Sequence, residues 1–228
     1  MSEPAKQAPQ LQHSVRVWDL PVRLCHWAFA LLIPAMWWTA ENSEWAWHKR
    51  LGLLLLGLLI FRIIWGVVGS QTARFSSFVR GPARVLTYLR GDRPPMIGHS
   101  PLGALSVVAL LLAMLLQVSL GLFAGDPFDG ATGPLNPLVG VLTADMLTDL
   151  HEAFFDVLVA LIGLHLAAIA YYAAVKRDNL VGPMISGKRT VSGEVKGNVP
   201  APWLLTALVA AAVAAFVAWI ASGAPPLS

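Results

Sequence analysis

The sequence is short of charged residues and almost free of cysteine. Of its 228 residues, 13% are charged and 56% are hydrophobic. A soluble domain carries about 25% charged residues, so this composition indicates a membrane protein rather than a water-soluble globule. The single Cys25 excludes an internal disulfide, a C-x-x-C metal or redox pair and a C-x-x-C-H attachment site. A covalently attached c-type haem is therefore excluded.

Five apolar stretches are each close to the roughly 20 residues that a membrane-spanning helix needs. They cover about residues 21–40, 49–69, 101–123, 151–175 and 202–221. We therefore predict an all-α integral membrane protein, a four-helix bundle to which the last, alanine-rich stretch adds a fifth, C-terminal helix. Residues 1–16 are polar and are expected to be disordered, and the polar, glycine-containing segment at about 176–200 predicts a loop.

The distribution of basic residues predicts the orientation. Of the 16 lysines and arginines, all but Lys49, Arg50 and Arg62 fall in segments on one side of the predicted topology. The positive-inside rule then places the N-terminus in the cytoplasm and the C-terminus outside. The same topology explains the dispersed basic residues, so nucleic-acid binding is not indicated. Four acidic residues lie on the outer side, namely Asp126, Asp129, Asp145 and Asp149.

Two histidines share one face of the fourth apolar stretch. His151 and His165 are 14 residues apart, which places them on nearly the same helix face and about 21 Å apart along the axis, within a hydrocarbon core about 30 Å thick. His26 and His48 lie at the ends of two other apolar helices, and depth pairs His26 with His165 near the inner surface and His48 with His151 near the outer. Two imidazoles give a six-coordinate haem iron suited to electron transfer.

This pattern predicts two non-covalent, bis-histidine haems stacked across the bilayer. A lone histidine at an interface is more often solvated than a ligand, but four histidines in two depth-matched pairs are much less easily explained by chance. A shared metal site is disfavoured because about 21 Å separates the pairs and no carboxylate or thiolate cluster completes a coordination shell.

Three further residues are candidates for cofactor or substrate contacts. Arg62 shares a helix face with His48 at the depth of the inner haem, and a buried arginine needs an anion such as a haem propionate; the alternative is that it snorkels to the surface. Arg23 is a second candidate for a propionate, although the positive-inside rule alone explains it. His99 opens the third helix on the inner side and is expected to bind quinone or pass its protons, unless it is a solvated loop residue.

Several motifs resemble the bacterial cytochrome b561 and nickel-iron hydrogenase b-type cytochrome subunit family over about residues 15–190. The segments that carry the resemblance are VWDLPVRLCHW, HKRLGLLLLGLLIFRIIWGVVG, GHSPLGALSVVALLLAMLLQVSLGLF and the HE…H helix followed by NLVGPMISGKR. The resemblance implies two b-type haems held by His26, His48, His151 and His165, and electron transfer between the quinone pool and a periplasmic partner. It divides the chain into an N-terminal tail (1–16), a dihaem domain (17–190) and a loop with the extra helix (191–228).

The function predicted from these observations is that of an electron-transfer subunit in the bacterial inner membrane, with quinone oxidoreductase activity left open. Expected partners are membrane lipid, quinone and either a periplasmic c-type cytochrome or hydrogenase subunits; a homodimer is left open. The acidic loop at 123–150 would steer a basic cytochrome, and the quinone would lie near the inner haem beside His99. One alternative is a stand-alone superoxide:quinone oxidoreductase, and another is a haem-free transporter or structural membrane protein.

Overall fold

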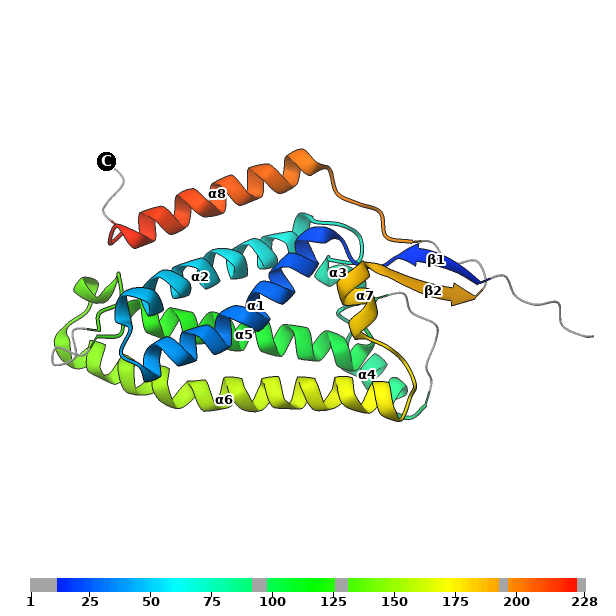
Figure 1. The fold of residues 1–228 in the computed structure, drawn as a ribbon, viewed down its shortest axis with the longest axis horizontal. Coiled ribbons are helices and arrows are strands. Elements are labelled where there is room, and N and C mark those ends of the chain that lie inside the picture. The colour runs from blue at the N-terminus through cyan, green and yellow to red at the C-terminus, as the bar shows by residue number, and fades with distance from the viewer. Residues whose placement is uncertain (1–11, 92–97, 126–130, 193–196, 225–228) are drawn as a thin grey trace, which may run out of the picture.

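The computed structural model describes residues 12–91, 98–125, 131–192 and 197–224. Five long helices dominate it (Figure 1), and each is long and apolar enough to cross a membrane. They are α1 (Leu20–Glu41), α2 (Trp45–Val68), α5 (Pro101–Phe123), α6 (Val141–Ala174) and α8 (Trp203–Ala221). The shorter elements are β1 (Gln12–Arg16), α3 (Phe75–Phe78), α4 (Pro82–Leu89), η1 (Asn136–Leu138), α7 (Val181–Ser186) and β2 (Lys188–Ser192). The predicted all-α membrane fold with a fifth helix is confirmed.

Local sequence signals set the starts of two of the long helices. Asp19 precedes α1, and its carboxylate accepts a hydrogen bond from the Val22 amide at 2.9 Å. Ser100 precedes α5, and its hydroxyl accepts one from the Gly103 amide at 3.1 Å. A proline follows within the first two positions of each helix, where its missing N–H costs no hydrogen bond.

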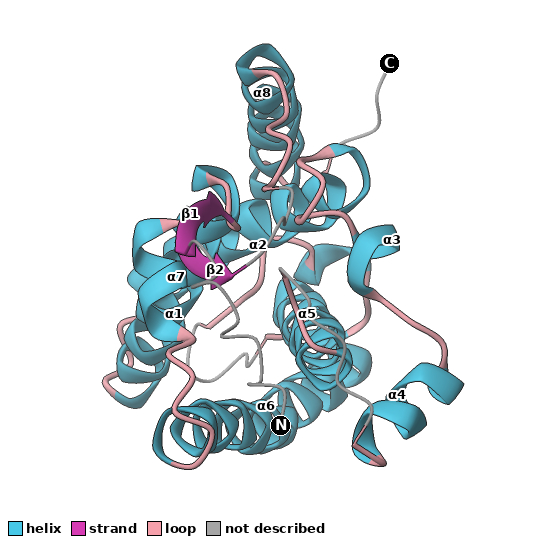
Figure 2. Ribbon diagram, turned by 90° about the vertical axis from the view of Figure 1, so that its right-hand side faces the viewer, coloured by secondary structure: helices cyan, strands magenta, loops and turns pink. Residues whose placement is uncertain are grey.

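Four of the long helices form the bundle, and the fifth lies outside it. Helices α1, α2, α5 and α6 surround a core that includes Leu59, Leu111 and Leu158, and α8 packs on α2 away from the other three (Figures 1 and 2). The side chain of Val217 on α8 lies against Gly57 of α2, where an added Cβ would be 3.4 Å away. The extra helix is therefore an addition to a four-helix unit.

The bundle has two different ends. At the strand end lie β1, β2, α7 and the first turns of α1 and α5; at the loop end lie the α1–α2 turn, η1 and the last turn of α8 (Figure 1). These two names are used below. The predicted topology places the strand end at the cytoplasmic surface.

Helix α6 is longer than its sequence predicted. It begins at Val141, ten residues before the expected start, and its 34 residues correspond to about 51 Å at 1.5 Å per residue. The expectation that Asp145 and Asp149 lie in a loop is therefore wrong, because residues 141–150 contain no glycine or proline to interrupt the helix. Asp126 and Asp129 lie outside the described residues.

A two-stranded ribbon at the strand end is the main departure from expectation. Residues 12–16 were expected to be disordered and 176–200 to be a loop, but the first segment forms β1 and the second contains α7 and β2. The strands pair antiparallel with Val15 opposite Arg189. Each segment alone has too little apolar surface to fold, whereas pairing lets Val15 join a buried cluster with Trp65. Strand β2 also crosses the predicted domain boundary at 190/191.

Gly187 makes the turn between α7 and β2 possible. It adopts φ +78°, a left-handed conformation that L-residues rarely occupy. An added Cβ would also lie 2.9 Å from the carbonyl oxygen of Trp18. The Gly187 carbonyl in turn accepts a hydrogen bond from the Val17 amide at 2.8 Å, so this turn ties the end of α7 to the entry of α1.

Candidate functional site

The four predicted histidines meet as two pairs inside the bundle. His26 of α1 faces His165 of α6 at the strand end, with ring centroids 6.5 Å apart and planes inclined by 58°. His48 of α2 faces His151 of α6 at the loop end, with centroids 6.3 Å apart and planes at 89°. The spatial pairs are those that depth predicted, and α6 contributes one member to each.

The spacing within each pair suits one metal ion between the rings. With metal–nitrogen bonds of about 2 Å, two imidazoles on opposite sides of one ion place their ring centroids roughly 6 Å apart. Across the residues that the structure describes, no cluster of three or more His, Cys, Asp or Glu side chains is placed to hold a metal ion. A metal ion held by either pair would need further ligands from a bound group, and a porphyrin is one group that would supply them.

Main-chain carbonyl groups orient both imidazoles at the loop end. Nδ1 of His48 lies 3.0 Å from the carbonyl oxygen of Met36 and 3.3 Å from the Thr39 hydroxyl. Nδ1 of His151 lies 2.9 Å from the carbonyl oxygen of Gln117. We assign the proton of each ring to Nδ1, because a carbonyl oxygen only accepts. This tautomer leaves the lone pair of Nε2 available for a metal, the usual arrangement in metal-ligating histidines, although Nε2 of His151 also lies 3.4 Å from the amide nitrogen of Gln117.

Helix α5 carries no ligand but shapes the pocket of His151. An added Cβ on Gly121 would lie 2.8 Å from Cε1 of His151, so the absence of a side chain there makes room for the imidazole. One turn earlier, Nε2 of Gln117 donates to the main-chain carbonyl of His151 at 2.8 Å. The sequence analysis missed Gln117; its signal was an amide side chain within a spanning segment, where polar groups are costly.

Among the described residues, the strand-end imidazoles have fewer hydrogen-bond partners than the loop-end imidazoles. Nδ1 of His165 lies 3.3 Å from the Ser106 hydroxyl, whereas Nδ1 of His26 is buried without a hydrogen-bond partner. Arg62 is buried, with 5% of its surface exposed, and its guanidinium lies 5.4 Å from the centroid of the Phe75 ring. Its Nη1 is also buried without a partner. The burial excludes the snorkelling alternative for Arg62.

His99 is half-buried and lies between two aromatic rings. Its ring centroid lies 4.5 Å from that of Trp18 and 4.5 Å from that of Phe78, and its Nδ1 is buried without a partner. Burial, reinforced by the nearby charge of Arg62, lowers the pKa of His99 to about 3. The ring is therefore neutral at physiological pH and carries one donor and one acceptor nitrogen.

Arg23 is directed toward α7. Its Nε donates to the carbonyl oxygen of Met184 at 3.4 Å, and its Nη2 donates to that of Ile185. Trp27 donates to the same Met184 carbonyl at 3.2 Å. The structure thus assigns Arg23 a role in fixing α7, and its contact with a haem propionate stays a prediction.

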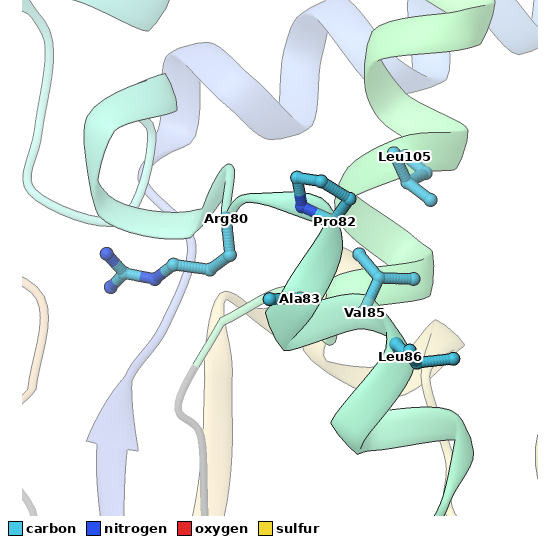
Figure 3. A pocket seen from close by; sticks show the side chains of 6 residues that line it. All are labelled: Arg80, Pro82, Ala83, Val85, Leu86 and Leu105. Atoms are coloured by element: carbon cyan, nitrogen blue, oxygen red, sulfur yellow. The ribbon is translucent and has the colours of Figure 1, made fainter.

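Two surface hollows lie apart from the histidine pairs. One, of about 560 Å³, lies between α4 and α5 and is lined by Arg80, Pro82, Ala83, Val85, Leu86 and Leu105. Figure 3 shows Val85, Leu86 and Leu105 on one side of it and Arg80 extending away. The other, of about 420 Å³ at the loop end, has Lys49 and Arg50 in its lining. No histidine lines either hollow, so the predicted quinone position beside His99 stays a prediction.

Most of the chain matches a known protein family. The family model described as prokaryotic cytochrome b561 matches residues 17–187. This range contains both histidine pairs, and it ends before α8. No curated protein and no solved structure matches the chain.

Proposed function

The chain belongs to the prokaryotic cytochrome b561 family, and from that premise we propose that it carries electrons through two haem b groups. Membership makes it a multi-pass membrane b-type cytochrome. The finer proposal is that His26 and His165 hold one haem and that His48 and His151 hold the other. The observation that carries it is the pair of centroid separations, 6.5 and 6.3 Å, each of which would allow both imidazoles to bind one metal ion.

The residues around the pairs have distinct tasks in this proposal. A bound haem supplies one-electron chemistry at its iron, and two imidazole ligands favour electron transfer over ligand binding. The carbonyl oxygens of Met36 and Gln117 hold the loop-end imidazoles with Nε2 toward the metal. Arg62 supplies a buried positive charge at the strand end. The helices that surround both sites are apolar.

We further propose that the electrons pass between membrane quinone and a periplasmic partner, a c-type cytochrome or a hydrogenase subunit. The excess of basic residues at the strand end supports a cytoplasmic position for that end and a periplasmic position for the C-terminus. The quinone would then react near the strand-end haem. A reporter enzyme that is active only in the periplasm, fused after α8, tests the topology; activity confined to a cytoplasmic reporter would contradict it.

The test of the cofactor proposal is stoichiometry in the purified full-length protein. Acid acetone should extract all of the haem, because no cysteine pair attaches it, and the pyridine haemochrome assay should give about two haems per chain. The exposed His13 on β1 offers a control, since His13→Ala should retain both. One haem per chain, with His48 and His151 both dispensable, would contradict the loop-end site.

Docking of the periplasmic partner involves exposed carboxylates at the loop end in this proposal. Asp145 and Asp149 are exposed on α6, and acidic side chains attract a basic cytochrome in a salt-dependent way. Replacing both with Asn should slow electron exchange with the partner and flatten its salt dependence, while quinone kinetics stay unchanged. An unaltered salt dependence, measured by stopped flow, would contradict this docking site.

A further inference from the structure

Buried polar nitrogens without partners gather at the strand end. They are Nδ1 of His26, Nη1 of Arg62 and Nδ1 of His99. Across the described residues, the only other buried side-chain nitrogen or oxygen without a partner is Oε1 of Gln117, at the loop end. A buried donor left without an acceptor is costly, and native proteins satisfy nearly all of them. Nη1 of Arg62 is always a donor, and each imidazole Nδ1 is a donor in one of its two tautomers. An acceptor at the strand end would therefore satisfy Arg62 and, in that tautomer, the imidazoles as well.

The buried carboxylate of Asp19 is already engaged. One oxygen of Asp19 accepts from the Trp65 indole at 2.8 Å, and the other accepts from the Val22 amide. No salt bridge to Arg62 occurs within the described part of the chain. A buried guanidinium beside a neutral donor is complementary to a carboxylate, which accepts from both.

His99 is fixed in place beside this charge. The Arg62 guanidinium lies 5.4 Å from the ring centroid of Phe75, and the Phe75 ring lies 5.7 Å from that of Phe78, which contacts His99. The rings of Trp18 and Phe78 hold its imidazole on two sides. The His99 imidazole is thus held in one position. A side chain held in this way is suited to a permanent hydrogen bond with a bound cofactor.

We propose that Arg62 and His99 together bind a propionate carboxylate of the strand-end haem. This inference rests on the proposed two-haem function. Arg62 donates from its guanidinium, and His99 donates from a neutral ring nitrogen. His99 is then an anchor for the cofactor and not the quinone or proton partner that its sequence position predicted.

The experiment is a redox titration of the full-length holoprotein at several pH values. His99→Leu removes the donor, which leaves the propionate more basic and its negative charge less balanced. We expect the equilibrium constant for reduction of the strand-end haem to fall roughly two- to tenfold, the value of one hydrogen bond. We also expect its midpoint potential to become more dependent on pH, because the propionate then takes up a proton on reduction.

Three controls separate this role from packing. His99→Gln keeps an N–H donor and should restore most of the wild-type potential. His13→Leu changes a histidine at the same end that is exposed, and should have no effect. The loop-end haem in the same molecule reports on overall folding and should keep its potential. If His99→Leu does not assemble, His99→Phe replaces it, since a phenyl ring fills the aromatic cage without a donor.

Several outcomes would overturn the proposal. An unchanged strand-end potential in His99→Leu would show that no propionate depends on His99, and a loss confined to quinol turnover would assign the residue to quinone. Equal shifts of the strand-end midpoint potential in His99→Gln and His99→Leu would show a packing effect. So would an equal shift of the midpoint potentials of both haems. Failure of the underlying function is seen separately, as fewer than two haems in the wild-type protein.

Discussion

The two histidine pairs have nearly equal ring spacing but different surroundings. At the loop end, His48 and His151 each direct Nδ1 at a main-chain carbonyl oxygen, at 3.0 and 2.9 Å. At the strand end, the described residues offer His165 a 3.3 Å contact with the Ser106 hydroxyl and offer Nδ1 of His26 no hydrogen-bond partner. The strand end instead holds the buried charge of Arg62.

Under the proposed function, the fold orients the loop-end site, whereas a bound haem would complete the strand-end site. Carbonyl oxygens on packed helices move little, so the loop-end imidazoles are fixed before a cofactor arrives. Hydrogen bonding of this kind also raises the basicity of the ligating nitrogen, which stabilises the oxidised iron. We therefore expect the loop-end haem to have the lower midpoint potential, and the variants below test this contrast.

Replacement of one of the four paired histidines should have the largest effect on haem binding. His26→Ala and His165→Ala should each lose the strand-end haem, while His48→Ala and His151→Ala lose the loop-end haem, because each iron then has one axial ligand. Spectroelectrochemical titration of each variant identifies the missing species. Loss of the same species in His26→Ala and His48→Ala would show that the pairing is wrong. A variant that fails to accumulate would be replaced by the corresponding change to Met.

The second-largest effect on haem binding is expected for a substitution at Gly121. In Gly121→Ala the new methyl group would lie 2.8 Å from the imidazole of His151, so the ring must shift and the loop-end haem should be weakly bound or lost. Gly163→Ala on α6 is the matched control, since nothing lies within 4 Å of its added Cβ, and alanine is the better helix former. Haem content and thermal stability distinguish the two. Equal haem content in both variants would contradict the close packing at Gly121.

A smaller effect is expected at Arg62. Arg62→Gln removes a buried positive charge that favours the reduced haem, so the strand-end midpoint potential should fall. A charged hydrogen bond of about 1.5–3 kcal/mol corresponds to roughly 65–130 mV for one electron. Arg62→Lys keeps the charge and should recover part of the shift. A fall at the loop-end haem instead would place Arg62 at the other site.

The smallest effect is expected at Ser106. Ser106→Ala removes the one protein partner of the His165 imidazole, which lowers the basicity of that ligand and should raise the strand-end potential. One hydrogen bond of about 1 kcal/mol corresponds to roughly 40 mV. Thr39→Val should change the loop-end potential less, because the Met36 carbonyl still accepts from His48. A larger shift in Thr39→Val would reverse the contrast between the two ends.

The sequence was sufficient for features that depend on local composition. Apolar length located all five spanning helices, and the matched depths of the four histidines predicted the pairs of rings that lie together in the structure. The partners of the loop-end imidazoles were not predictable. Every residue has a carbonyl group, so Met36 and Gln117 carry no sequence signal for this role, and only the packing of the helices selects them.

The ribbon was missed for a related reason. Strands β1 and β2 pair residues more than 170 positions apart, and neither strand is apolar enough to be recognised alone. The early start of α6 at Val141 was missed because apolar length was the criterion, and its first turns carry Asp145 and Asp149. Helix length and membrane-span length are different quantities when a helix continues into water.

The β1–β2 ribbon also constrains the order in which parts of the chain can fold during synthesis. During synthesis at about 5–20 residues per second, β1 waits roughly 10–30 s for β2 to be made. All four helices of the bundle are made before β2. Trp18, which packs against His99, lies just beyond β1 and is drawn in when the ribbon forms. The β1–β2 ribbon is thus the last part of the four-helix unit that can be completed during synthesis.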